Sequence, residues 1–249
     1  MTLEEILKRL RPQGSEANLA GMARYGIVPR GGLGVPMPVL RKLARECGHS
    51  HALADELWAS DVHELRILAT LVDEPALVTR QQMDRWARDL YSWDVCDQAC
   101  SNLFRYTPFA FERAARWAHA REEFVRRAGF SLMAGLAVKA KTATDEQFEA
   151  FFPLIRDAAT DERNMVKKAV NWALRQIGKR NPRLRVKAIR VAEDIRKIDS
   201  RSARWIAADA LRELRSQPVL TRAQANTPVP PKTRVRSRRS TSSAPPSGS

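Results

Sequence analysis

The sequence of 249 residues lacks most of the patterns that mark common enzyme classes. It has only three cysteines, Cys47, Cys96 and Cys100, and no recurring CxxC pair, so buried thiols are favoured over disulfides. Its four histidines have no metal-binding spacing, and neither a GxSxG elbow nor a Walker motif is present. We therefore expect no metal and no cofactor.

Long apolar runs are also missing. The longest extends from Gly129 to Val138, well below the roughly 20 residues that a membrane-spanning helix needs. The amino terminus has no signal-peptide pattern, because Thr2 and Glu5 form a capping box that starts a helix instead. We expect a soluble, cytoplasmic protein that is not bound to a membrane.

Acidic residues are too few to balance the basic ones. Lysine and arginine total 43 against 28 aspartates and glutamates, which gives a net charge of +15. The segment after residue 216 has six basic residues and no acid, so the part before it is basic on its own account. Such a field attracts polyanions, and nucleic acid is the leading candidate, with an incidental basic surface as the alternative.

Strand signals are almost absent, and helical periodicity with N-cap residues recurs between gaps that contain proline or glycine. Many helices of similar length with short connections predict stacked antiparallel pairs, although no crisp sequence repeat is present. We expect an all-α fold, a right-handed α-α superhelix of HEAT-like repeats that forms a curved solenoid with a concave basic face. A compact helical bundle is the alternative. The expected helices span residues 2–12, 15–25, 37–47, 49–58, 61–72, 79–90, 92–104, 109–118, 121–138, 144–156, 161–179, 182–198 and 200–216.

Two segments fall outside the periodic pattern. We assign residues 1–216 to the repeat domain and residues 217–249 to a disordered basic tail, since a segment rich in Pro, Ser, Thr and Arg cannot offset its ordering entropy. The tail is either a nonspecific arm on nucleic acid or a dispensable solubilising segment.

The glycine-rich segment 31–34 does not follow a strand. Its N–H groups and Arg30 could meet a phosphate, but a plain connector is favoured.

The stretch 92–98 places an aromatic ring and two carboxylates at the start of a helix. Ser92 is a natural N-cap whose hydroxyl can accept a backbone N–H. Trp93 and Asp97 are four residues apart and share one face, where they could stabilise a cation. Asp94 lies in the first turn, so we interpret it mainly as structural.

The helix expected at 161–179 carries a tryptophan opposite its apolar face. Trp172 shares its side of the helix with Lys168, Arg175 and Lys179. A tryptophan in a basic row suggests contact with a nucleic-acid backbone, and the alternative is that a neighbouring repeat covers the ring.

Arg127 lies where the helix 121–138 becomes apolar on nearly all sides. A charge at such a position needs a partner. That partner could be an internal carboxylate, such as Asp97, or a phosphate of a ligand.

Three motifs in this order resemble the DNA alkylation repair family, the AlkD-type alkylpurine DNA glycosylases built of HEAT-like repeats. They are W-D-x-x-D from Trp93, K-A-x-x-W-x-L-R from Lys168, and K-x-N-P from Lys179, and the likeness covers most of residues 1–200. The resemblance implies a solenoid that cradles duplex DNA and removes cationic N3- and N7-alkylated purines. It implies cytoplasmic, nucleoid-associated action as a monomer, without an obligate protein partner.

The resemblance also implies roles for single residues. By position, the two tryptophans of the family correspond to Trp93 and Trp172, the catalytic aspartate to Asp97, and the arginine that contacts the DNA backbone to Arg127. Val95 and Cys96 depart from the family pattern between the two acids, without displacing Asp97.

The chemistry expected of these residues is simple. An alkylated purine is already cationic, so it leaves without a general acid, and the sugar cation that develops can be stabilised by aromatic faces and a carboxylate. No lysine nucleophile is needed, which predicts a monofunctional glycosylase. The rival interpretations are a non-enzymatic scaffold that recognises damaged or distorted DNA, and a helical-repeat protein adaptor.

Overall fold

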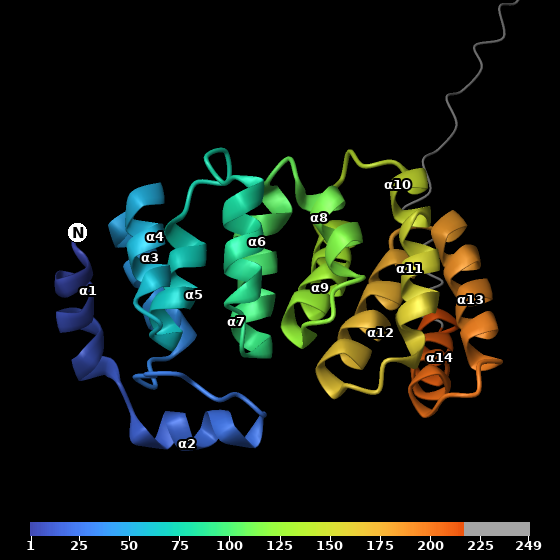
Figure 1. The fold of residues 1–249 in the computed structure, drawn as a ribbon, viewed down its shortest axis with the longest axis horizontal. Helices are drawn as coiled ribbons and strands as arrows, with labels where there is room; N and C mark the ends of the chain where they lie inside the picture. Colours follow the sequence, from blue (N-terminus) through green and yellow to red (C-terminus); the bar gives the residue numbers. More distant parts are fainter. Residues whose placement is uncertain (217–249) are drawn as a thin grey trace, which may run out of the picture.

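The fold is a row of antiparallel helix pairs, seen in a computed structural model that describes residues 1–216. Figure 1 shows the pairs side by side from the N-terminal end to α14. Every regular element in this range is helical, which confirms the predicted all-α solenoid of HEAT-like repeats over a compact bundle. The predicted tail, 217–249, lies outside the described residues. The pairs are α4 (His51–Ala59) with α5 (His63–Val72), α6 (Arg80–Arg88) with α7 (Trp93–Gln98), α8 (Ala110–Trp117) with α9 (Glu123–Lys139), α11 (Phe151–Asp157) with α12 (Asn164–Gly178), and α13 (Pro182–Arg196) with α14 (Arg201–Leu214).

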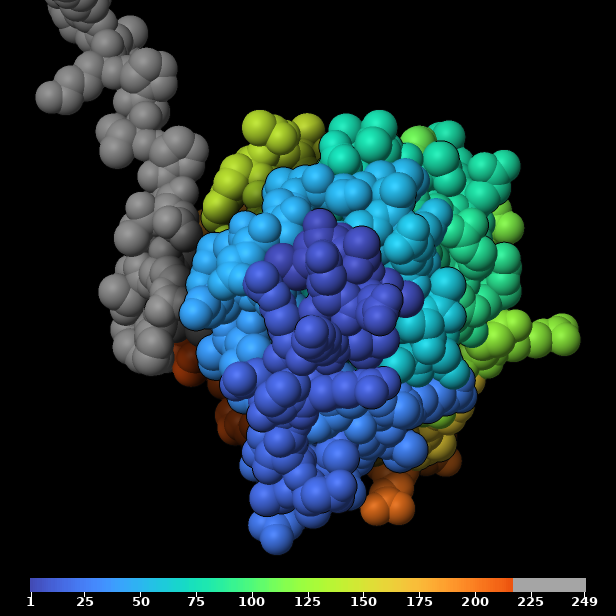
Figure 2. Space-filling model, turned by 90° about the vertical axis from the view of Figure 1, so that its left-hand side faces the viewer, coloured from blue at the N-terminus to red at the C-terminus, as the bar shows by residue number. Residues whose placement is uncertain are grey.

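The N-terminal helices are arranged differently from the pairs. α1 (Leu3–Leu10) begins with the expected Thr2–Glu5 capping box and continues into a 3₁₀ turn, Arg11–Gln13. α2 (Glu16–Arg24) buries no residue completely and crosses below the row, as Figures 1 and 2 both show. α3 (Met37–Cys47) then returns to the row and packs against α5. Among the α-helices of residues 1–216, α2 alone has no buried residue.

Close packing of successive repeats depends on small residues. A Cβ atom on Gly129 of α9 would stand 2.7 Å from the Ala118 nitrogen and 3.0 Å from the Ala114 oxygen, both belonging to the segment of α8. Glycine is thus required where these two helices touch. The rest of α9 is apolar and buried on nearly every side, from Ala128 to Ala137, as its sequence predicts.

The helix expected at 92–104 is not continuous. α7 ends at Gln98, and a π-helical turn, Ala99–Leu103, and a 3₁₀ turn, Phe104–Tyr106, follow. The wider turn lets the Asn102 amide donate to Thr70 of α5 at 3.0 Å and to Gln98 at 2.9 Å. Single π turns often occur at functional sites, and this one begins two residues after Asp97.

The helix expected at 144–156 is also divided. It consists of α10 (Asp145–Glu149), which begins with the Thr144–Gln147 capping box, and α11 after Ala150. Pro153 lies in the first turn of α11. Proline has no N–H to donate and its ring clashes with the carbonyl four residues earlier, so an unbroken helix is disfavoured here.

The glycine-rich connector between α2 and α3 is fixed by a buried carboxylate. Glu64 of α5 is 1% exposed and accepts backbone N–H groups from Leu33 at 2.9 Å, Gly34 at 2.7 Å and Val35 at 3.2 Å. Gly34 has a φ of +73°, and a Cβ there would stand 2.2 Å from the Ser15 oxygen. These N–H groups are already used by Glu64, so they are not available to a phosphate.

Replacing Glu64 by alanine should destabilise the fold. The change leaves three backbone donors without their charged acceptor, and we expect a loss of about 2 to 4 kcal/mol in the free energy of unfolding. Urea denaturation followed by circular dichroism measures it. Glu56→Ala, an exposed glutamate on neighbouring α4, is the control and should change stability by less than about 0.5 kcal/mol. Equal stability of the two variants would contradict the anchoring role.

Candidate functional site

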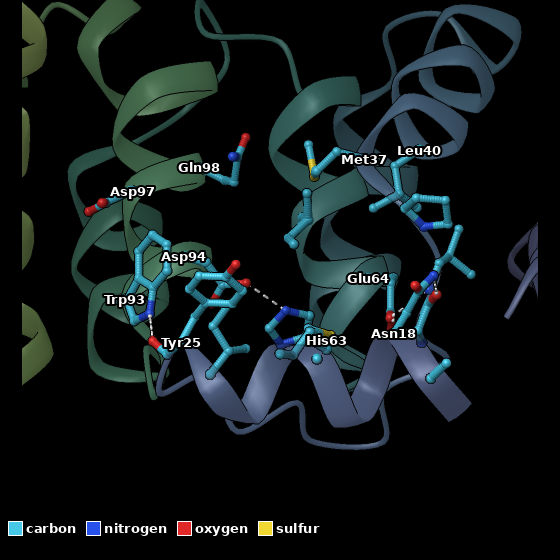
Figure 3. A pocket seen from close by; sticks show the side chains of 18 residues that line it. Asn18, Tyr25, Met37, Leu40, His63, Glu64, Trp93, Asp94, Asp97 and Gln98 are labelled. Atoms are coloured by element: carbon cyan, nitrogen blue, oxygen red, sulfur yellow. Dashed lines mark hydrogen bonds and ion pairs between the residues drawn. The ribbon is translucent and has the colours of Figure 1, made fainter. Parts of the chain in front are cut away.

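Asp97 is held in a fixed orientation by two residues of α9. Its carboxylate accepts hydrogen bonds from Arg127 Nε at 3.2 Å and Nη2 at 2.7 Å, and from the Ser131 hydroxyl at 2.8 Å. The side chain keeps 20% exposure. Figure 3 shows it directed away from the side chains of Asp94 and Gln98. The result is a charged acceptor that is partly accessible and cannot rotate freely.

Arg127 connects the second helices of three successive pairs, α7, α9 and α12. Besides Asp97 of α7, its guanidinium donates to the Met165 carbonyl at the start of α12 at 2.7 Å. It also lies 5.9 Å from the centroid of the Trp93 ring. Burial tends to lower the pKa of Arg127, but the charge and hydrogen bonds of Asp97, together with the neighbouring thiols of Cys96 and Cys100, outweigh burial and the pKa is raised. Of the two partners that the sequence left open, the structure places the internal carboxylate beside Arg127, and the phosphate contact stays a prediction.

Trp93 forms one wall of a cavity of about 510 Å³ beneath α2. Its indole Nε1 donates to the Tyr25 carbonyl at 3.0 Å, directly after the end of α2 (Figure 3). The cavity is mostly apolar. Its lining includes Met22, Ile27, Met37, Leu40 and Ile67, together with the acidic side chains of Glu64, Asp94 and Asp97.

Asp94 anchors the start of α7 to α5. Its carboxylate lies 2.8 Å from His63 Nε2 and accepts the Ser92 hydroxyl, while His63 Nδ1 lies 3.1 Å from the Tyr91 hydroxyl. Burial opposes ionisation of Asp94, but the hydrogen bonds from His63 and Ser92 outweigh it and lower the pKa. The predicted cap is wrong in one detail. Ser92 occupies the N-cap position, but its hydroxyl donates to Asp94 instead of accepting a backbone N–H.

Trp172 lies partly exposed on α12, with its apolar neighbours on the opposite side buried as predicted. Its indole Nε1 is 3.1 Å from the Gln176 amide oxygen, in the amide orientation that satisfies its neighbours, and Lys179 Nζ is 3.2 Å from the same oxygen. Lys168, one turn before Trp172, is exposed and has no ion-pair partner within residues 1–216. It is the freest cation of the predicted set on α12.

Two other predicted DNA-binding residues are partly neutralised by α14. Glu213 accepts Arg175 and Lys179 at 2.5 Å each, and Asp209 lies 3.5 Å from Arg175. Asn171 also donates to Asp209, at 2.6 Å. Hydrogen bonds and charges of both cations outweigh burial and lower the pKa of Glu213. The basic row on α12 therefore exists, but part of its charge is compensated within the protein.

Arg30, the last predicted contact, lies on the connector after α2. It is exposed, and its guanidinium carbon lies 4.3 Å from the centroid of the Tyr91 ring. Its carbonyl accepts the His63 N–H at 2.9 Å. The backbone of Arg30 is thus fixed at the start of α5, while its charge remains at the surface.

Trp93 and Trp172 are connected through Met165, at the start of α12. Trp93 bonds to Tyr25, and the Met165 methyl lies beside the next residue, 3.6 Å from where a Cβ of Gly26 would stand. Met165 is seven residues before Trp172, which puts both on one face of α12. Arg127 therefore bonds to Asp97 and lies 5.9 Å from the centroid of the Trp93 ring, and Trp172 follows Met165 by about two turns of α12.

Sequence reasoning missed several residues of this site. Ser131 had a signal, because it is a lone hydroxyl within the apolar part of its helix. The Tyr25 carbonyl and Glu213 had none, because each acts through contacts far away in the sequence. The described residues contain no cluster of three or more histidines, cysteines or acids that could hold a metal, and none of their helices is long and apolar enough to cross a membrane.

Comparisons with known proteins concern the family and the fold of the chain. The family model described as DNA alkylation repair enzyme matches residues 6–214. One solved structure belongs to "a new family of proteins related to the HEAT-like repeat DNA glycosylases with affinity for branched DNA structures". It is 18% identical, with a TM-score of 0.71, over 85% of this chain and 95% of its own. A designed armadillo repeat protein is 13% identical over 71% of this chain and 92% of its own, with a TM-score of 0.34. No curated protein matches.

Removing Arg127 alone should lower the free energy of unfolding more than removing both charges of the Arg127–Asp97 ion pair. Arg127→Met leaves Asp97 largely buried without its counter-charge. We expect a loss of about 2 to 3 kcal/mol in unfolding free energy, less than for a fully buried pair because Asp97 is partly exposed. Adding Asp97→Asn to Arg127→Met should restore part of this stability. Chemical denaturation of the two single variants and the double variant measures the coupling; strictly additive losses would argue against it.

Proposed function

The chain belongs to the DNA alkylation repair enzyme family, and on this premise we propose that it is a monofunctional DNA glycosylase. Its proposed substrates are cationic N3- and N7-alkylated purines in duplex DNA. One observation carries the proposal. The carboxylate of Asp97 is held by Arg127 and Ser131 while partly accessible, and the same arginine lies beside the ring of Trp93 and bonds to the Met165 carbonyl, about two helical turns before Trp172.

The proposed reaction breaks the bond between the sugar C1′ and the purine N9. The electron pair of this bond moves to the base, which leaves uncharged because alkylation had made it cationic, so no acid has to protonate it. Positive character then develops at C1′. The carboxylate of Asp97 and the faces of Trp93 and Trp172 stabilise that charge. Water adds to C1′, and Asp97 accepts its proton.

We propose that DNA lies along α7, α9 and α12. The reaction needs no protein partner. Lys168 and Arg30 are exposed cations that can contact phosphates directly. Arg175 and Lys179 share Glu213, so each contributes less than a free cation. Arg127 acts mainly by holding Asp97, because its side chain is only 7% exposed. We further propose that the protein acts as a monomer, in the cytoplasm, on the DNA of the nucleoid.

A second candidate function is recognition of damaged or distorted DNA without excision. Both carboxylate oxygens of Asp97 are engaged, Oδ1 by Arg127 and Ser131 and Oδ2 by Arg127, which leaves few acceptor positions for an attacking water. The solved relative described by its affinity for branched DNA structures has the same fold. This candidate retains the basic inner surface but not the hydrolytic step.

Asp97→Asn separates the two candidates. For a glycosylase, release of 7-methylguanine from methylated duplex should fall by about 100-fold or more, while DNA affinity stays within a few-fold, because the change removes charge at the reacting sugar and not a phosphate contact. Base release is measured by chromatography and affinity by fluorescence anisotropy.

The matched control is Asp199→Asn, at a fully exposed side chain before α14, which should change neither quantity. Wild-type protein that binds the duplex but releases no base would support the second candidate. Parallel loss of binding and release in Asp97→Asn would instead make Asp97 a structural residue.

A further inference from the structure

A second cavity, of about 560 Å³, lies where the C-terminal ends of α9 and α12 meet. It is more polar than the cavity beneath α2. Its lining consists of Ala137, Val138, Lys141, Gln176, Lys179, Arg180 and Asn181.

The two cavities carry opposite charge. The cavity beneath α2 is lined by three acidic residues and by no lysine or arginine, whereas this one is lined by three basic residues and by no acidic one. Lys141 is exposed and has no ion-pair partner among residues 1–216. Lys179 shares Glu213 with Arg175, which also lies 3.5 Å from Asp209, so the charge of Lys179 is only partly compensated. An anion is favoured at this cavity and disfavoured at the other.

Arg180 makes the cavity wall compatible with an anion. The C-terminal end of a helix carries partial negative charge on its last carbonyl groups, which repels anions. The Arg180 guanidinium donates to the carbonyls of Ala137 at 3.1 Å, Ala140 at 2.7 Å and Ala143 at 2.9 Å, at and just beyond the end of α9. It thereby covers the groups that would otherwise repel an anion, and it holds the wall in place.

The cavity adjoins Trp172 directly. Gln176 lines the cavity, and its amide oxygen bonds both to the Trp172 indole and to Lys179 Nζ. Four residues along an α-helix correspond to a rise of about 6 Å, so the cavity starts roughly one turn from Trp172. Consecutive phosphates of one DNA strand are separated by a distance of similar order.

From these observations we propose that the cavity between Lys141 and Lys179 binds one backbone phosphate of the DNA strand whose nucleotide faces Trp172. The identity of the polyanion as DNA rests on the proposed function, whereas the anion preference rests on the lining residues alone. Lys141 and Lys179 supply the charge, and Gln176 positions Lys179. The contact would fix the register of the strand relative to Trp172.

The salt dependence of binding to an undamaged duplex tests the proposal. Each phosphate neutralised by a lysine contributes about 0.9 to the slope of the logarithm of the binding constant against that of the salt concentration. Lys141→Ala should therefore reduce the magnitude of the slope by about 0.9 and weaken binding several-fold at low salt. Lys141→Arg should keep both. Fluorescence anisotropy over a series of salt concentrations measures them with the full chain.

Lys139→Ala is the matched control. Lys139 is an exposed lysine two residues away that does not line the cavity, so its removal should leave the slope unchanged. Equal effects of the two substitutions, or no effect of Lys141→Ala, would overturn the proposal. Binding of inorganic phosphate that depends on Lys141, with an unchanged DNA slope, would assign the cavity to a free anion and overturn it as well.

The excision assay keeps the two proposals distinguishable. A slope that changes as expected in a protein that releases no base would retain the phosphate site and refute the glycosylase. If excision continues and the slope is unchanged in Lys141→Ala, the glycosylase would be retained and the phosphate site refuted. Wild-type protein without salt-dependent DNA binding would refute both.

Discussion

The ion pair between Arg127 and Asp97 is the contact on which the arrangement of the inner helices depends. It connects α7 to α9, and the bond from Arg127 to the Met165 carbonyl extends the connection to α12. A largely buried pair of this kind contributes little net stability but penalises any arrangement that separates its partners. The same contact therefore fixes the packing of three repeats and orients the carboxylate proposed to act in catalysis, so stability and function cannot vary independently at Asp97.

Acidic and basic side chains gather at two different cavities of the solenoid. Carboxylates gather where α2 covers α5 and α7, and lysines gather at the far ends of α9 and α12. Trp172 lies between the two. A nucleic acid with a cationic base and anionic phosphates would find complementary charge at both ends, which a uniformly basic surface cannot provide. The compensation of Arg175 and Lys179 by Glu213 sharpens this division, because Lys141 and Lys168 are exposed and have no ion-pair partner within residues 1–216.

The sequence predicted what helical periodicity controls. The shared face of Trp93 and Asp97, the row of Trp172 with Lys168, and the all-helical repeat fold follow from spacings of three and four residues. It could not predict contacts between repeats, because their partners lie 30 or more residues apart without a fixed period. The bonds from Ser131 to Asp97 and from Glu64 to the connector are examples. The π turn after Gln98 has the same origin, since it depends on the reach of Asn102 to α5.

The bonding of Asp97 also limits how it can act. A carboxylate has about four lone-pair positions, and three hydrogen bonds are present here. Oδ1 accepts two of them, from Arg127 and Ser131, whereas Oδ2 accepts only one, from Arg127. Oδ2 therefore keeps the one free acceptor position, and any water that Asp97 activates has to approach that atom. The hydrogen bonds that orient Asp97 thus also direct its action. The reaction asks little of the carboxylate as a base, because the bound purine is already cationic and most of the driving force lies in its departure.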